Sequence, residues 1–307
     1  MSDMFPRPAI QTLSLGRPEV GHDIFDKIRA AKNAGFQGIE ISYFCLAEHA
    51  KQNGESLQEA AHATRALLDE LELEVVSLSP LMNFEGFVDR SVHAERLELA
   101  KSWLELARIL GAPVVQIPAC MMPDISLELS VADLIELCDL AGNIGILYEF
   151  TSWSTLVRTW QECIQVALEV DRPNFTICLD AFHIGTFHYP LQFPTPHTAS
   201  KFTLYQLTDA APVPDPLPKN QPAQDPNAPG VQTMSRTNRP FPFTSADGLL
   251  PVADISRTVW NLQKNSKEAV WWSMEVFDPL AWSEDKSVPE KTALIGWKSW
   301  QQVIERL

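Results

Sequence analysis

Four short apolar stretches decide the fold: Ile146-Leu-Tyr-Glu-Phe150, Ile177-Cys-Leu-Asp-Ala181, Leu204-Tyr-Gln-Leu207 and Trp272-Ser-Met-Glu-Val276. Each carries one acidic or amide residue near its end: Glu149, Asp180, Gln206 and Glu275. Near-continuous apolar character over so few residues is typical of parallel strands that are buried on both faces. If these strands are neighbours in a closed barrel, the four polar side chains converge at its C-terminal mouth.

Outward from these stretches, the chain alternates between strand-like and helix-like segments. Four more apolar runs precede the first stretch, which gives eight predicted strands at about residues 9–15, 38–44, 75–81, 114–120, 145–150, 176–182, 202–209 and 269–277. Segments with helical periodicity lie between them, and the clearest runs from residue 95 to residue 110. This alternation predicts an α/β fold, a single (β/α)8 barrel over residues 1–307.

One segment interrupts the alternation. Residues 211–245, between the seventh and eighth strands, are dense in Pro, Asn and Asp. A proline-rich linker would split a barrel just before its last strand, so we interpret the segment as a long inserted loop folded over the mouth. The loop contains Ser235, Arg236 and Arg239 in an otherwise acidic protein.

Composition excludes several partners. The formal net charge of −15 disfavours binding to nucleic acid phosphates. We identify no signal peptide and no apolar run long enough to cross a membrane. The five cysteines form no Cys-x-x-Cys pair and are odd in number, which indicates buried free thiols in a reducing compartment, here the cytoplasm. The sequence leaves the oligomeric state open, a homo-oligomer included.

The four strand-end residues suit a metal ion. Three carboxylates and one amide oxygen form an oxygen-rich site for a hard divalent cation, for which Mg²⁺ and Mn²⁺ are the best candidates. Each residue also has a structural alternative. Glu149 could be satisfied by strand-end amides, Asp180 could cap a following helix, and Gln206 could bond to neighbours in the core. Carboxylates beside so much apolar bulk favour the metal.

Other polar and aromatic residues lie near the same strand ends. His183 follows Asp180 by three residues and is predicted to act as an acid or base or to contact the substrate; a supporting hydrogen-bond role is the alternative. Glu40 could form a structural salt bridge or belong to the site. Trp153 could wall the pocket or pack in the core, and His188 is expected to pack within its loop.

These motifs resemble the xylose-isomerase-like barrel superfamily and, more closely, its 3-dehydroshikimate dehydratases. The resemblance spans nearly the whole chain and rests on Tyr148-Glu-Phe-Thr-Ser-Trp153, Cys178-Leu-Asp-Ala-Phe-His183, Gln206-Leu-Thr-Asp209 and Met234-Ser-Arg-Thr-Asn-Arg-Pro-Phe-Pro242. It implies that Glu149, Asp180, Gln206 and Glu275 hold one divalent metal ion. It also implies that His183 faces the substrate and that Ser235 and Arg239 reach it from the long loop.

One departure from the family pattern bears on the substrate. Met82 lies near a position where the family resemblance implies an arginine that binds a substrate carboxylate, and Phe187 stands where fungal relatives often have arginine. Because these side chains carry no charge, the sequence predicts a pocket poorer in cations. It therefore predicts weak 3-dehydroshikimate dehydratase activity and a less charged substrate.

The resemblance implies proton abstraction next to a carbonyl group of a small hydroxy-carbonyl compound. A divalent ion stabilises the negative charge that develops on the enolate oxygen. Expulsion of a hydroxyl group gives a dehydratase, whereas reprotonation gives an isomerase or epimerase, and the ligand set serves both outcomes. The loop with Ser235 and Arg239 favours the lyase. A barrel that binds metal without catalysis is a third alternative.

Overall fold

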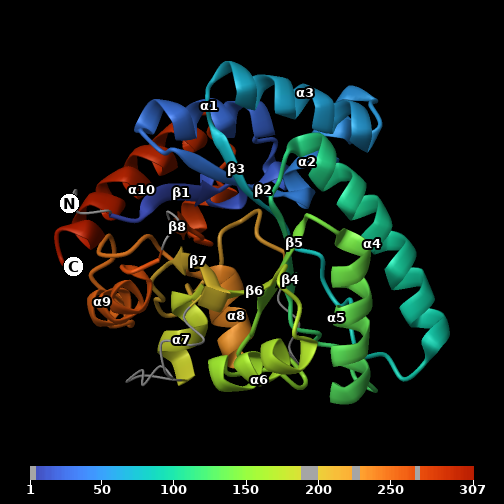
Figure 1. The fold of residues 1–307 in the computed structure, drawn as a ribbon. Coiled ribbons are helices and arrows are strands. Elements are labelled where there is room, and N and C mark those ends of the chain that lie inside the picture. Colours follow the sequence, from blue (N-terminus) through green and yellow to red (C-terminus); the bar gives the residue numbers. More distant parts are fainter. Residues whose placement is uncertain (1–4, 188–199, 223–228, 267–269) are drawn as a thin grey trace.

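Eight parallel strands close into a barrel in chain order, with β8 paired to β1 (Figure 1). The computed structural model describes residues 5–187, 200–222, 229–266 and 270–307. The strands are β1 (Arg7–Gln11), β2 (Gly38–Ser42), β3 (Glu74–Ser79), β4 (Val114–Pro118), β5 (Gly145–Glu149), β6 (Phe175–Asp180), β7 (Phe202–Leu207) and β8 (Trp271–Met274). The predicted (β/α)8 architecture is confirmed.

Helices form the outer layer of the barrel (Figure 1). They are α1 (Ile24–Ala34), α2 (Tyr43–Asn53), α3 (Leu57–Glu70), α4 (Arg90–Leu110), α5 (Leu127–Ala141), α6 (Trp160–Val170), α7 (Ala181–Phe187), α9 (Val252–Gln263) and α10 (Val288–Ile304). Helix α8 (Gly230–Thr237) lies instead at the C-terminal ends of the strands. None of the described helices is long and apolar enough to cross a membrane.

Local sequence signals explain where several helices begin and end. Helices α3 and α6 each begin with a capping box, formed by Ser56 with Glu59 and by Thr159 with Glu162, which satisfies backbone N–H groups at the first turn. Helix α4 ends at Gly111, whose φ of 68° lies in the left-handed region that glycine adopts without strain.

The first strand is shorter at its C-terminal end than the sequence predicted. Strand β1 ends at Gln11, and residues Thr12–Leu15 form a 3-10 helix. The reason is local, because the Gln11 side-chain oxygen accepts a hydrogen bond from the Leu13 backbone N–H and turns the chain out of the sheet. The same turn carries the chain toward the mouth of the barrel.

The barrel interior is layered. Its N-terminal end holds an apolar cluster made of Ala9, Val76, Leu147, Cys178 and Leu204. Strand register places Asp180 level with Gln206, and Gln206 level with Ser273. Because parallel register puts such residues at one height, the polar side chains of β6, β7 and β8 form layers above the apolar floor.

The connection between β7 and β8 is the longest one in the described chain, and it carries α8 and α9. Residues 223–228 and 267–269 of this connection lie outside the description. An isolated antiparallel bridge joins Arg239 to Phe277, which follows β8. The segment predicted as a loop over the mouth is therefore attached to the strand ends next to the site.

Candidate active site

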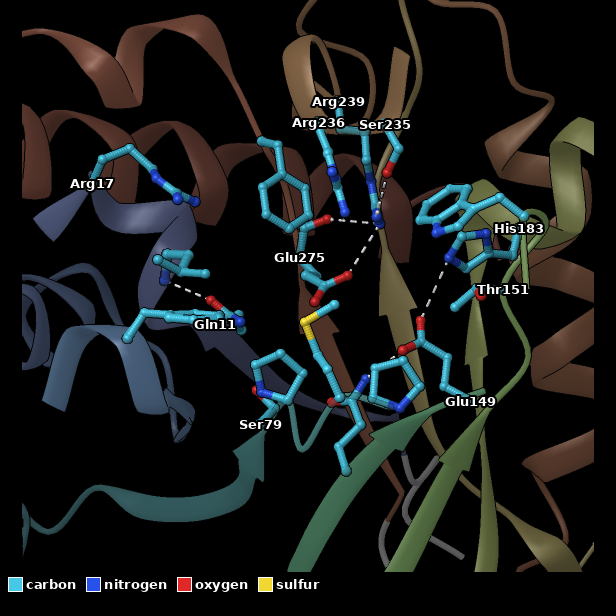
Figure 2. A pocket seen from close by; sticks show the side chains of 18 of the residues that line it. Gln11, Arg17, Ser79, Glu149, Thr151, His183, Ser235, Arg236, Arg239 and Glu275 are labelled. Carbon is cyan, nitrogen blue, oxygen red and sulfur yellow. Dashed lines mark hydrogen bonds and ion pairs between the residues drawn. The ribbon is translucent and has the colours of Figure 1, made fainter. Parts of the chain in front are cut away.

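A cavity of about 530 Å³ opens at the C-terminal ends of the strands. This volume is typical of small-molecule sites. Its wall includes Glu149, His183, Ser235, Arg239 and Glu275, which Figure 2 shows around a common centre. In a barrel of this kind, the mouth at the C-terminal ends of the strands is where catalytic residues gather.

The three predicted carboxylates converge here. Glu149 ends β5, Asp180 ends β6, and Glu275 follows β8 directly, and all three are buried. Glu149 Oε2 accepts a hydrogen bond of 2.8 Å from Gln116. Asp180 Oδ1 accepts one of 2.6 Å from the Phe182 backbone N–H, as a helix cap would, while its Oδ2 faces the site. Asp180 therefore caps α7 with one carboxylate oxygen and faces the site with the other.

Arg239 lies between two of these carboxylates. Its Nη2 donates to Asp180 Oδ2 at 2.7 Å and to Glu275 Oε2 at 3.2 Å, and Nη1 is 3.4 Å from Ser235 Oγ. The guanidinium is fully buried beside the rings of Phe182 and Phe277. The sequence suggested an arginine on a loop that reaches for substrate, but this side chain is already engaged with the carboxylates.

His183 faces the same carboxylates from α7. Its Nε2 lies 3.7 Å from Glu149 Oε1 and 3.9 Å from Asp180 Oδ2. On the other side of the ring, Nδ1 accepts a hydrogen bond of 3.2 Å from the Ser152 backbone N–H and lies 3.0 Å from Ser152 Oγ. A backbone N–H can only donate, so this contact favours the tautomer that carries its proton on Nε2.

The Cα of Gln206 is level with that of Asp180, but its buried side chain does not line the cavity and joins a network of polar side chains inside the barrel. Its Nε2 donates to Glu40 at 3.2 and 3.3 Å and to Gln116 Oε1 at 3.2 Å. Its Oε1 accepts from Gln116 at 3.4 Å and from Cys178 Sγ at 3.3 Å. Glu40 also accepts from Ser77 at 2.8 Å, so it belongs to this network through hydrogen bonds.

The carboxylates carry more negative charge than their surroundings neutralise. Burial, and next the charge of Asp180, raises the pKa of Glu149 to about 8. Burial also raises the pKa of Glu275 well above its ordinary value, against the effect of Arg239. Burial acts upward on the pKa of Asp180 as well, but Arg239 and His183 lower it overall. One guanidinium thus compensates three carboxyl groups only in part.

This donor set fits a divalent cation. One ligand atom from each of Glu149, Asp180 and His183 can lie within 4.8 Å of the other two. Carboxylate oxygens are the ligands that Mg²⁺ and Mn²⁺ prefer, and a double positive charge would offset the burial and the charge of Asp180 that together raise the pKa of Glu149. The raised pKa values of Glu149 and Glu275 and the close approach of Glu149, Asp180 and His183 indicate an ion, although Glu275 does not belong to this group of three.

The cavity wall also holds two further arginines. Arg17 was not identified from the sequence, and Arg236 was named from it without an assigned role. Arg17 lies in the connection after β1, and Arg236 lies on α8. The expectation of a cation-poor pocket considered positions 82 and 187 and overlooked position 17. Arg17 follows a predicted strand end by two residues, and this βα-loop position was the signal that could have identified it.

Aromatic and apolar residues complete the wall. Met82 and Trp153 both line the cavity, and the Trp153 ring lies 4.8 Å from the ring of His183. The prediction that Trp153 walls the pocket agrees with this position. The side chain of Phe187 and all of His188 lie outside the described residues.

A second group with ligand-type side chains lies away from the cavity. His93, Asp133 and Glu136 come together on α4 and α5. Asp133, however, accepts hydrogen bonds from the Gly86 backbone N–H at 2.8 Å and from Arg90 at 2.6 Å. These contacts account for its burial by anchoring the segment between β3 and α4.

Comparisons with known proteins agree with this arrangement. The xylose isomerase-like TIM barrel family matches residues 28–286. A 3-dehydroshikimate dehydratase of Neurospora crassa is 32% identical over 339 aligned residues, which cover 97% of this chain and 94% of that protein. Two solved structures share the fold, a xylose isomerase-like TIM barrel/4-hydroxyphenylpyruvate dioxygenase fusion protein and the IOLI protein with a bound zinc atom.

The two structures differ in how much of their chains is matched. The fusion protein has a TM-score of 0.76 and 22% identity over 98% of this chain, but the match covers only 43% of the fusion protein. The IOLI protein has a TM-score of 0.71 and 18% identity, with 98% of both chains covered. At these identities the likeness concerns the fold alone.

Eight parallel strands that alternate with helices and close into a barrel define the (β/α)8 class of proteins, and its members carry their sites at the C-terminal mouth, as here. Within that class, the chain belongs to the xylose isomerase-like TIM barrel family. The resemblance to 3-dehydroshikimate dehydratases, inferred from motifs, is confirmed by the full-length similarity to the Neurospora crassa protein.

Proposed function

We propose that this protein is a divalent-metal-dependent lyase that dehydrates a small hydroxy-carbonyl compound. The observation that carries the proposal is the convergence of Glu149, Asp180, Glu275 and His183 on one cavity. The similarity to a 3-dehydroshikimate dehydratase over 97% of the chain supports a dehydration in preference to an isomerisation or epimerisation.

Glu149, Asp180 and Glu275 would hold the metal ion, with Gln206 as a fourth ligand. Mg²⁺ or Mn²⁺ suits this oxygen set, and the ion would supply positive charge where an enolate develops. For Gln206 to join, its Oε1 must exchange the contacts with Gln116 and Cys178 for the ion. The Glu40 carboxylate, which receives the Gln206 amide N–H, would keep that oxygen turned away from Glu40.

His183 directs its Nε2 toward the substrate. With Nδ1 accepting from Ser152, Nε2 carries the proton and can donate it in a hydrogen bond to a substrate oxygen. The Ser152 hydroxyl can also accept from Nδ1, which in the other tautomer leaves Nε2 free to take up a proton. We therefore assign His183 to proton transfer or substrate contact, separate from the metal ligands.

Ser235 and Arg239 serve the same site from the long connection. Arg239 spans Asp180 and Glu275 and limits their repulsion. Ser235 lies 3.4 Å from Arg239 Nη1 and on the cavity wall, where its hydroxyl can donate to a substrate oxygen. In the overall reaction, one C–H proton and one hydroxyl group leave adjacent carbons as water, and a carbon–carbon double bond forms.

The test is a direct assay. The purified protein is stripped with EDTA, reloaded with Mn²⁺ or Mg²⁺, and incubated with 3-dehydroshikimate while the absorbance of the aromatic product is followed. We expect turnover that requires the added ion. A metal-loaded protein that leaves 3-dehydroshikimate unchanged but epimerises a ketose would contradict the lyase and favour the isomerase alternative.

A further inference from the structure

We propose that Arg17, on the wall of the cavity away from His183, is the residue that binds the carboxylate of the substrate and so determines specificity. The inference rests on the proposed function, because it assigns a residue to substrate binding in the same cavity. Figure 2 shows Arg17 and His183 on opposite sides of the site, with Glu275 between them. A substrate held at both walls would place its carboxylate at Arg17 and its reacting end beside Glu149 and His183.

Contacts from two connections hold Arg17 in place. Its guanidinium carbon lies 4.7 Å from the centre of the Trp282 ring, and its backbone N–H donates to the Ala281 carbonyl at 3.0 Å. Trp282 ends a 3-10 helix, Pro279–Trp282, after β8. Because stacking restricts the guanidinium before any ligand arrives, little side-chain freedom would be lost on binding.

The guanidinium retains donors for a ligand. Glu19 engages Nη2 at 2.7 Å, which uses part of a group that carries five N–H donors. Within the described residues, Arg17 Nε is buried without a hydrogen-bond partner. A planar carboxylate accepts two parallel N–H bonds from such a fork, which a lysine cannot reproduce.

Of the other arginines of the wall, Arg239 is already engaged with Asp180 and Glu275, and Arg236 remains a competitor for the carboxylate. Arg236 lies on α8, where its backbone carbonyl accepts from Gln221 at 2.9 Å. The two positions can be separated experimentally because they belong to different elements.

Charge balance at the cavity favours an acid. A divalent ion and Arg239 together would neutralise the three strand-end carboxylates. Among the described residues, Arg17 is then paired with Glu19, which also lines the cavity and whose side chain is 48% exposed and therefore weakly held in the ion pair. A ligand carboxylate in the less exposed cavity would compete favourably with water for Arg17.

The test compares two ligands that differ only in the carboxylate. Catechol and 3,4-dihydroxybenzoate are titrated by calorimetry into the Mn²⁺-loaded wild type and into Arg17→Met, Arg17→Lys and Arg236→Met. Met keeps the length of the apolar stem, and Lys keeps the charge without the planar fork. The Mn²⁺ affinity and thermal midpoint of each variant report whether the metal site and the fold are intact.

We expect Arg17→Met to bind 3,4-dihydroxybenzoate about 10- to 100-fold more weakly than the wild type, the range for a lost hydrogen bond to a charged group. Its affinity for catechol should not change. Arg17→Lys should lie between the wild type and Arg17→Met, and it serves as the informative variant if Arg17→Met does not fold. Arg236→Met should retain the preference for the acid.

The opposite pattern would overturn this assignment. If Arg236→Met loses the preference for the acid while Arg17→Met keeps it, Arg236 on α8 binds the carboxylate. A wild type that binds both ligands equally also refutes the role of Arg17. Failure of the proposed function would give a different result. A metal-loaded wild type could prefer the acid through Arg17 and still leave 3-dehydroshikimate unchanged. That result would contradict the lyase and leave the carboxylate-binding role of Arg17 intact.

Discussion

Two walls of the cavity are built in different ways. The strand-end wall consists of Glu149, Asp180 and Glu275, which sit at or directly after the ends of barrel strands. The loop wall consists of Arg17, Gln221, Arg236 and Trp282, which come from the connections after β1, β7 and β8. The strand-end wall is fixed by the hydrogen bonds of the closed barrel, whereas the loop wall is fixed by contacts between connections.

The strand-end wall suits the chemical step, and the loop wall suits recognition of the substrate. Groups that hold an ion must keep their relative positions closely, and strand ends provide that rigidity. Groups that read the remote part of a substrate can vary from one relative to another, because loops tolerate substitution. Arg17 supplies a cation to the loop wall, whereas Met82, which lines the same cavity, carries no charge.

The largest expected effect comes from breaking the strand-end wall. Glu149→Ala and Glu275→Ala each remove a proposed ligand and should abolish the retention of a divalent ion and, with it, turnover. Elemental analysis after gel filtration measures the bound metal. Arg17→Met, from the loop wall, is the matched control and should retain the ion. Full metal occupancy in either glutamate variant would refute the ligand assignment.

A smaller effect is expected at His183, which faces the strand-end wall without belonging to it. His183→Gln should lower turnover by roughly 10²- to 10⁴-fold, the usual range for a lost general acid or base. The metal should stay bound if the carboxylates hold it, whereas loss of the ion from this variant would show that His183, which lies within 4.8 Å of Glu149 and Asp180, is itself a ligand. Steady-state kinetics and metal analysis of the same sample separate the two functions. Unchanged turnover would assign His183 a supporting hydrogen-bond role.

The strand-end wall was largely predictable from the sequence, and the loop wall was not. Apolar runs with one terminal carboxylate identify strand ends, and a closed barrel brings successive strand ends together, so Glu149, Asp180 and Glu275 could be placed on one mouth. The position of Arg17 in the cavity wall was not predicted, because it depends on stacking against Trp282, which is 265 positions away in the chain. No local pattern encodes such a contact.

Which side chains line the cavity was also beyond sequence reasoning. Gln206 was grouped with the three carboxylates, and its Cα is level with that of Asp180, yet its side chain bonds to Glu40 and Gln116 and does not line the cavity. Which side chains reach the cavity depends on strand register and barrel shear, which a single sequence does not specify. Arg239 was expected to reach the substrate from a long loop, and the contacts that hold it, a backbone bridge to Phe277 and ion pairs with Asp180 and Glu275, are long-range and have no local sequence signal.

The buried arginine of the strand-end wall offers a test of stability. Arg239→Met leaves Asp180 and Glu275 without their cation, and breaking a buried ion pair in this way costs about 3–5 kcal/mol. Urea unfolding in EDTA measures the loss. Mn²⁺ should stabilise the variant more than it stabilises the wild type, because the ion then carries the whole compensation. Equal stabilisation by Mn²⁺ in both proteins would show that Arg239 and the ion do not share these carboxylates.

The smallest expected effect concerns a buried cation behind the loop wall. Lys27 on α1 is fully buried, and its Nζ donates to Cys45 Sγ at 3.1 Å, with no carboxylate partner among the described residues. Burial lowers its pKa, and Cys45 offsets this only in part. Arg239 has two carboxylate partners, so the two cations should respond in opposite ways to replacement.

Because the folded pKa of Lys27 lies below its unfolded value, the folded state binds fewer protons between the two values. The free energy of unfolding therefore falls as the pH drops through that window, and the cost is greatest below the folded pKa. Lys27→Met removes this cost and should raise the free energy of unfolding by ~1–2 kcal/mol at neutral pH. The gain should shrink as the pH approaches about 10.4, the value for an exposed lysine. Urea unfolding of both proteins at neutral and alkaline pH measures it, and a variant less stable at both pH values would show that the Lys27–Cys45 contact itself supports the loop wall.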